Sequence, residues 1–210
     1  MPLATNHSTP IFLARTLSLL LHPMTMVLWM SFVAVFGFVG RLTYPSSIRW
    51  YVVGTVAFMT IFIPCLFLWL MRLFGGTKRE QATARHGRIM VLVALVVCYT
   101  CCGWVFDNVV VLYLVRKMLY TATSVVVLLL VFELFYPLSY HTTAMGALLG
   151  MMWALLMVGN TTLLIPFIVG VMAAGLLATS RIYLHGYSLG RVVWGVLLGF
   201  VLGAVMLVVI

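Results

Sequence analysis

Three short polar segments, far apart in the sequence, carry the residue types that bind and cleave phosphate esters. They contribute Lys78, Arg85, Ser139, His141, Ser180, Arg181 and His185. A guanidinium fork and an ammonium group neutralise a phosphate dianion, and hydroxyls donate hydrogen bonds to it. An imidazole acts as a nucleophile or as the acid for the leaving oxygen. Lys78 and Arg85 are seven residues apart, so a helical segment would present both on one face.

The composition indicates which elements have to position these side chains. The chain has 210 residues, of which 65% are hydrophobic and 7% are charged. An average soluble domain is about half apolar and a quarter charged, which excludes that class. Disorder is excluded by the same numbers, and four cysteines are too few for a disulfide scaffold. A formal charge of +9 on a membrane chain points to anionic lipid or phosphate-bearing substrates rather than to nucleic acid.

Long apolar runs predict an all-α fold, a polytopic transmembrane helical bundle of six to seven spans in a single membrane domain, residues 1–210. Residues 1–22 are expected to form an interfacial segment. The spans are predicted near 24–40, 50–71, 89–106, 118–136, 142–158, 163–179 and 192–210. Asp107 and Asn108 break the third run, and Arg116 and Lys117 follow the next one, so 109–115 is predicted to be re-entrant or interfacial.

Seven spans would place the segments 72–88, 137–141 and 180–191 on the same side of the membrane. That side then holds eight of the twelve basic residues, and the three phosphate-binding segments converge on one end of the bundle. Basic residues beside spans also set membrane topology by the positive-inside rule. The sequence leaves these two interpretations open.

The spacing of Lys78-x6-Arg85, Ser139-Tyr140-His141 and Ser180-Arg181 resembles the three-part signature of the type-2 phosphatidic acid phosphatase family, in a short all-membrane bacterial branch. The resemblance implies hydrolysis of lipid phosphates or pyrophosphates in a bacterial inner membrane, through a phosphohistidine and without a metal or other cofactor. It implies that His141 protonates the leaving group. The phosphate-binding residues that it implies are Lys78, Arg85, Ser139, Ser180 and Arg181.

The third part of that signature is incomplete in this chain. Tyr187 stands where the family has its nucleophilic histidine, and Gly190 and Arg191 stand where it has the acid that orients that histidine. An active enzyme would therefore use His185 or Tyr187 as its nucleophile. The alternative is an inactive relative that binds anionic lipid or scaffolds a membrane partner.

Two further features lie inside the predicted spans. Glu133 is an ionisable residue at membrane depth and so a functional candidate, which could orient His141, pair with Arg85, or reach the interface. Gly195, Gly199 and Gly203 recur every four residues, a strip that lets another helix approach closely, in this chain or in a second copy. Cys98, Cys101 and Cys102 are interpreted as small apolar side chains rather than metal ligands. A transporter would also fit the span count, but duplicated halves are not visible in the sequence.

Overall fold

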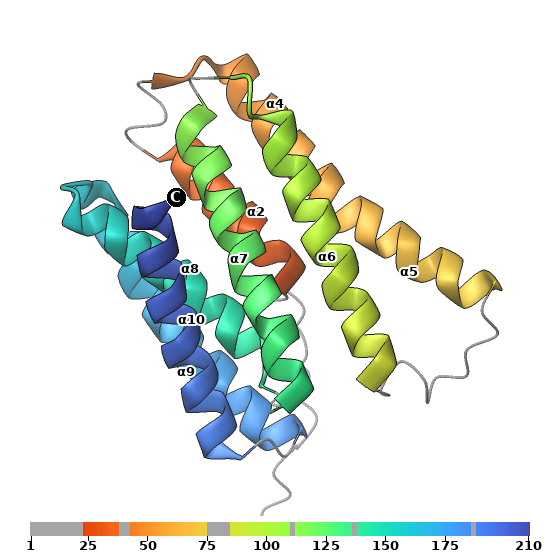
Figure 1. Cartoon of the computed structure of the whole chain (residues 1–210). Helices are drawn as coiled ribbons and strands as arrows, with labels where there is room; N and C mark the ends of the chain where they lie inside the picture. The colour runs from red at the N-terminus through yellow and green to blue at the C-terminus, as the bar shows by residue number, and fades with distance from the viewer. Residues whose placement is uncertain (1–22, 38–42, 75–84, 110–111, 136–137, 186–187) are drawn as a thin grey trace, which may run out of the picture.

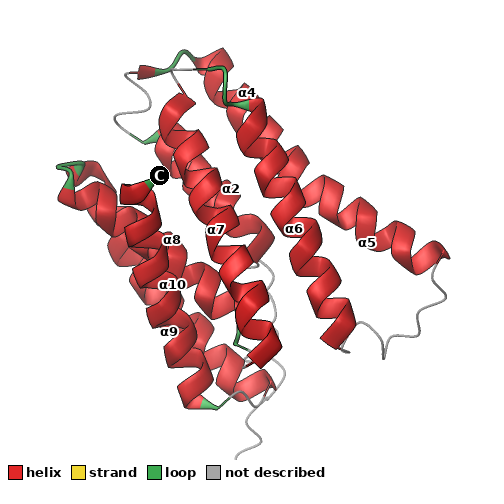
Figure 2. Cartoon of the chain, viewed as in Figure 1, coloured by secondary structure: helices red, strands yellow, loops and turns green. Residues whose placement is uncertain are grey.

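The described part of the chain is helical almost throughout. The structure is a computed structural model that describes residues 23–37, 43–74, 85–109, 112–135, 138–185 and 188–210. Of these residues 91% are helical and none is in a strand, and Figure 2 shows short loops between the helices. Long apolar runs with few polar breaks give this outcome, because a helix satisfies all its backbone hydrogen bonds internally. The predicted all-α class is confirmed.

Successive helices run in alternating directions, except that α4, η1 and α5 continue one another with a bend (Figure 1). In chain order they are α2 (Pro23–Phe36), α4 (Ser46–Ala57), the π-helical η1 (Phe58–Phe62), α5 (Ile63–Phe74), α6 (Arg85–Val105), α7 (Tyr113–Phe135), α8 (Tyr140–Met157), the 3-10 turn η3 (Thr161–Leu163), α9 (Leu164–His185) and α10 (Leu189–Val209). Within the described residues, five segments are long and apolar enough to cross a membrane: Ser46–Leu70, Gly87–Val105, Tyr113–Glu133, Thr161–Ile182 and Leu189–Val209.

Large apolar side chains cover the outside of this bundle. On α9 and α10, for example, Ile165, Met172 and Val201 are exposed, whereas a water-soluble monomer rarely exposes contiguous apolar surface of this kind. Together with the five long apolar helices, this surface identifies an integral membrane protein with several spans. Residues 1–22, predicted to be interfacial, lie outside the described residues.

Helix α7 begins five residues before the predicted fourth span, which removes the re-entrant interpretation of 109–115, whereas its interfacial alternative stays a prediction. Helix α7 begins at Tyr113, so Arg116 and Lys117 lie in its first turns and do not end a re-entrant segment at 115. The Arg116 guanidinium lies over the Tyr113 ring, 5.1 Å from its centroid, and its Nη1 donates to Asp107 Oδ1 at 3.0 Å. A helix end at the membrane surface accommodates such charges, because long side chains reach the polar interface.

Pro64 follows a local change of helix type. Residues Phe58–Phe62 form a π-helical segment, η1, directly before α5, and the axis turns between α4 and α5 (Figure 1). Proline cannot donate a backbone hydrogen bond, so nearby groups have to satisfy the freed carbonyls. The buried Thr60 hydroxyl donates to Val56 O at 2.8 Å in this region, a polar contact made without solvent.

Two clusters of buried apolar side chains hold the helices together. One joins α2, α4, α6 and α7, and the other joins α2, α7, α8, α9 and α10. Helix α2 contributes Met24 and Val27 to the first cluster and Met26 and Met30 to the second. This short apolar helix therefore links the two groups of longer ones.

Helices α8 and α10 pack through glycines from both sides. A methyl group at Gly199 would lie 2.9 Å from Ala147 N, and one at Gly150 would lie 2.8 Å from Ala204 N. Both contacted atoms belong to helix backbone, which approaches this closely only where side chains are absent. The strip of Gly195, Gly199 and Gly203 is thus occupied by α8 of the same chain. The structure gives this strip an intrachain contact, and a contact with a second copy stays a prediction.

Candidate functional site

The ends of several helices meet where the sequence predicted a polar site. The start of α6, the end of α7, the end of α9 and the start of α10 lie at the lower end of the bundle in Figure 1. Helix α8 begins five residues after α7 ends, so its first turn belongs to the same end. Of the predicted residues, Lys78 and Tyr187 lie outside the described residues. Arg85 and His185 are placed by their backbone alone, as the first residue of α6 and the last of α9.

Three of the predicted phosphate-binding residues are buried at this end. Ser139 directly precedes α8, and its carbonyl accepts hydrogen bonds from the Thr142 and Thr143 hydroxyls at 2.9 and 3.2 Å. Ser180 and Arg181 lie in the last two turns of α9, where Ser180 Oγ donates to Leu177 O at 2.8 Å. Both are buried. A buried guanidinium in a membrane helix is costly, and such residues commonly mark binding sites.

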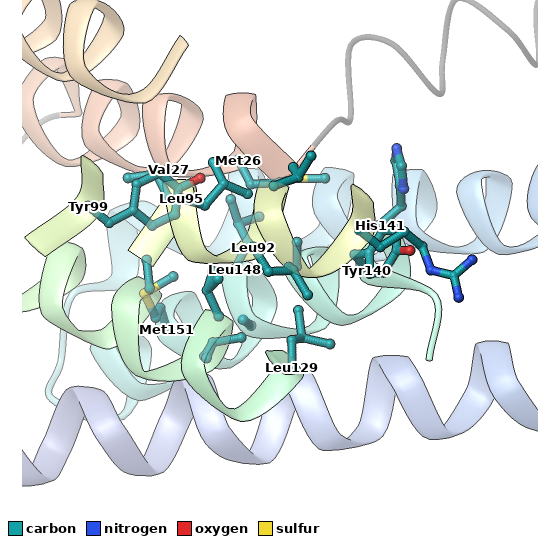
Figure 3. Close-up of a pocket in the computed structure, with 17 residues that line it drawn as sticks. Met26, Val27, Leu92, Leu95, Tyr99, Leu129, Tyr140, His141, Leu148 and Met151 are labelled. Atoms are coloured by element: carbon teal, nitrogen blue, oxygen red, sulfur yellow. The ribbon is translucent and has the colours of Figure 1, made fainter. Parts of the chain in front are cut away.

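His141 lies on the wall of a cavity that begins at this end. The cavity has a volume of about 210 Å³ and lies between α2, α6, α7 and α8. Its polar lining residues are Arg88, Tyr140 and His141, together with Tyr99 deeper in the bundle. Figure 3 shows Tyr140 and His141 at one end and Tyr99 and Met151 at the other. The remaining lining side chains are apolar.

A buried ion pair borders the same cavity. Arg88 Nε donates to Glu133 Oε1 at 2.7 Å, joining α6 to α7. The Glu133 side chain is 2% exposed, whereas that of Arg88 is 33% exposed. Glu133 was expected to orient His141, to pair with Arg85, or to reach the interface. The structure pairs it with Arg88, three residues after Arg85 on α6. The side chain of Arg85 lies outside what the structure describes, so the contact with Arg85 stays a prediction, as does the orientation of His141.

Sequence reasoning counted Arg88 among the basic residues of this end and gave it no role. The pairing joins positions 45 residues apart, and nothing in either local sequence predicts it. The residue types alone could have indicated this pair, because an acidic side chain inside a membrane span needs a basic partner at the same depth. Arg88 meets that condition, since α6 begins where α7 ends.

The described residues offer no cluster of three His, Cys, Asp or Glu side chains that could hold a metal ion. Cys98 and Cys102 are buried in α6 and Cys101 is exposed. The first two belong to the apolar cluster around that helix. The chemistry available at the described site is therefore that of cations, hydroxyls and an imidazole beside an apolar cavity.

The arrangement fits a ligand with an anionic head and an apolar body. Arg88 supplies a cation and His141 an imidazole, and apolar walls extend from them into the bundle. Ser139, Ser180 and Arg181 add buried polar groups at the same end. A comparison of the chain with protein-family models, curated proteins and solved structures finds no match.

Proposed function

We propose that this protein is a metal-independent phosphatase of a bacterial inner membrane that hydrolyses lipid phosphates or pyrophosphates. The observation that carries the proposal is the place of His141, on the wall of an apolar cavity at the end of the bundle where Ser139, Ser180 and Arg181 are buried. A lipid phosphate has an apolar body and an anionic head, which this combination suits. The resemblance of the three polar segments to the type-2 phosphatidic acid phosphatase signature supports the same reaction class.

The proposed reaction proceeds in two displacements. Lys78, Arg85 and Arg181 neutralise the phosphate oxygens, and a nucleophile, His185 or Tyr187, attacks phosphorus. The bond from phosphorus to the lipid oxygen breaks, and His141 gives its proton to that leaving oxygen. Water then attacks the phosphorylated residue, His141 accepts a proton from it, and inorganic phosphate leaves.

Phosphate release from the purified protein tests this proposal. We expect release from phosphatidate or a prenyl pyrophosphate in lipid nanodiscs, and a loss of about 100- to 10,000-fold in His141→Ala. Arg116→Gln serves as the matched control, because it removes a charge at the opposite end of the bundle. An absence of release, with an active family member assayed in parallel, would overturn the proposal.

A second function is favoured by the first turn of α10. Gly190 and Arg191 stand there in place of the acid that the family signature has, and Glu133 is engaged with Arg88. These features suit an inactive relative that binds anionic lipid or scaffolds a membrane partner. It predicts lipid binding without phosphate release, and release on Tyr187→His would show that only the nucleophile is missing.

A further inference from the structure

The cavity beside His141 is long and narrow. Tyr99 follows Arg88 by eleven residues on α6, about 16 Å along a helix axis at 1.5 Å per residue. Met151 follows His141 by ten residues on α8, which is about 15 Å. Figure 3 shows Leu92 and Leu148 between these two ends. The cavity therefore extends from the polar end of the bundle over about three helical turns.

The volume limits what can occupy this length. The cavity holds about 210 Å³, compared with about 150 Å³ for a cavity that takes one benzene molecule and about 300–1,000 Å³ for sites of drug-sized ligands. Spread over about 16 Å of helix, this volume fits one hydrocarbon chain and is too small for two side by side. Between the polar end and Tyr99 the lining is apolar and offers no partner for a polar chain.

The polar end of the cavity carries a cation. Arg88 is among the lining residues and its side chain is one third exposed, whereas that of Glu133 is nearly fully buried and is not among them. The Glu133 carboxylate contacts Nε of Arg88. A guanidinium has five N–H donors in a rigid plane, so a bond at Nε fixes the direction of the two terminal nitrogens.

Stability alone does not account for this ion pair. Replacing a buried ion pair with apolar residues of similar volume is commonly neutral or stabilising. In a membrane protein, paired charges inside the bundle are associated with ligand sites. Arg88 lies on the wall of the cavity, as does His141. This position suggests that the ion pair contributes to binding a ligand in the cavity.

We propose that the cavity binds the single hydrocarbon chain of an anionic amphiphile, whose phosphate contacts Arg88. Glu133 is a positioning residue that holds the Arg88 guanidinium toward the phosphate. This inference rests on the proposed function for the phosphate head and adds the chain number and a further anion-binding residue. A single-chain lipid phosphate is the substrate class that follows, in preference to a two-chain phosphatidate.

Photo-crosslinking tests the binding without requiring turnover. The protein in nanodiscs of zwitterionic lipid is incubated with dodecyl phosphate that carries a diazirine at its last carbon. We expect crosslinks to peptides of α6 around Tyr99 or of α8 around Met151. Unlabelled dodecyl phosphate should compete at least about tenfold better than dodecanol, as expected for a charge-assisted hydrogen bond. It should also compete better than dioleoyl phosphatidate, because the cavity volume is too small for two chains side by side. Crosslinks confined to lipid-facing peptides of α9 would overturn the proposal.

Two substitutions test the polar end. Arg88→Gln should weaken competition by dodecyl phosphate about tenfold or more and leave competition by dodecanol unchanged. Glu133→Gln keeps the shape of the side chain and removes its charge. It should also weaken competition by dodecyl phosphate relative to competition by dodecanol. Arg116→Gln should change neither. Equal loss of both competitors, or no loss of either, would show that Arg88 does not bind the phosphate.

A cavity-filling substitution tests the chain. Ala122 is buried on α7 and lines the cavity, so Ala122→Leu should reduce crosslinking about tenfold or more, whereas Ala178→Leu on α9, outside the lining, should not. Far-UV circular dichroism checks that both variants are folded. Undiminished crosslinking in folded Ala122→Leu would place the chain elsewhere.

The two proposals fail in different ways. Selective crosslinking without phosphate release would overturn the phosphatase proposal and retain the binding site. Release from phosphatidate at the same rate in wild type and Ala122→Leu would retain the phosphatase proposal and overturn the single-chain inference.

Discussion

The close contact between α8 and α10 leads to a quantitative prediction for Gly199→Ala. The added methyl group would lie 2.9 Å from Ala147 N and 2.9 Å from Thr143 C. Both are backbone atoms, so no change of side-chain rotamer relieves the contact. The carbonyl oxygen of Thr143 is nearer still. Ordinary contact begins at 3.4 Å, so the helices must separate by at least about half an ångström, enough to forfeit about a quarter or more of the attraction between facing atoms.

Gly175→Ala is the matched control for this substitution. Gly175 lies in α9, and a methyl group there would meet nothing within 4 Å. Alanine gains about 0.5–1 kcal/mol over glycine within a helix, and this gain cancels between the two variants. What remains is the cost of overpacking a close-packed contact, about 1–3 kcal/mol. We therefore expect Gly199→Ala to be less stable than Gly175→Ala by that amount, about 5- to 150-fold in the unfolding equilibrium constant.

Unfolding in mixed micelles of increasing dodecyl sulfate content measures this difference, followed by circular dichroism and tryptophan fluorescence. Equal stability of the two variants would refute the reasoning, because α10 would then not rest on α8 through its glycines. The difference should also be independent of protein concentration. A dependence on concentration would mean that the glycines meet a second copy of the chain.

Three further predictions concern polar contacts and use the same unfolding measurement. Glu133→Leu should lower the free energy of unfolding by about 2–3 kcal/mol, which is below the usual range for a broken buried pair because Arg88 is one third exposed. Adding Arg88→Met to this variant should recover most of that loss. A larger loss in the double variant would contradict this account. Arg116→Gln should change stability by less than about 1 kcal/mol, because the side chains of that ion pair are 29% and 43% exposed, and a larger change would indicate a buried role. Thr60→Val should lower the free energy of unfolding by about 1 kcal/mol, because it removes a buried hydrogen bond from the hydroxyl to a helix carbonyl. Thr179→Val removes an exposed hydrogen bond of the same kind and should lower it less. Equal losses in the two variants would show that burial of the hydrogen bond does not affect its contribution.

The helices were largely predictable because apolar runs of this length have few alternatives in a membrane. The error at 109–115 has a local cause. Arg116 and Lys117 looked like a stop signal, and the compensating contacts of Arg116 with Asp107 and Tyr113 depend on the geometry of the turn. Sequence alone does not show whether a charge ends a helix or lies in its first turn at the interface.

The site was predictable only in part, for a related reason. The arrangement of polar segments at one end followed from counting spans. The cavity could not be predicted in this way, because leucine, valine and methionine occur on all faces of every span, so the sequence does not show which helix faces pack together. Glu133 was recognised by its residue type, but its contact with Arg88 depends on the rotation of α6 against α7, which these uniform sequences do not specify.

Helix α8 has a consequence for how the chain enters the membrane during synthesis. Eleven of its residues are buried, and it is absent from the five described segments that are apolar enough to cross alone. Its first turn carries Tyr140, His141 and two threonines, which partition poorly into hydrocarbon. Because its main packing partner α10 follows it in the chain, we expect α8 to stay beside the translocation machinery, or beside α2 and α7, until α10 emerges. Membrane insertion of α8, α9 and α10 would then be a cooperative event of three helices rather than a sequence of independent ones.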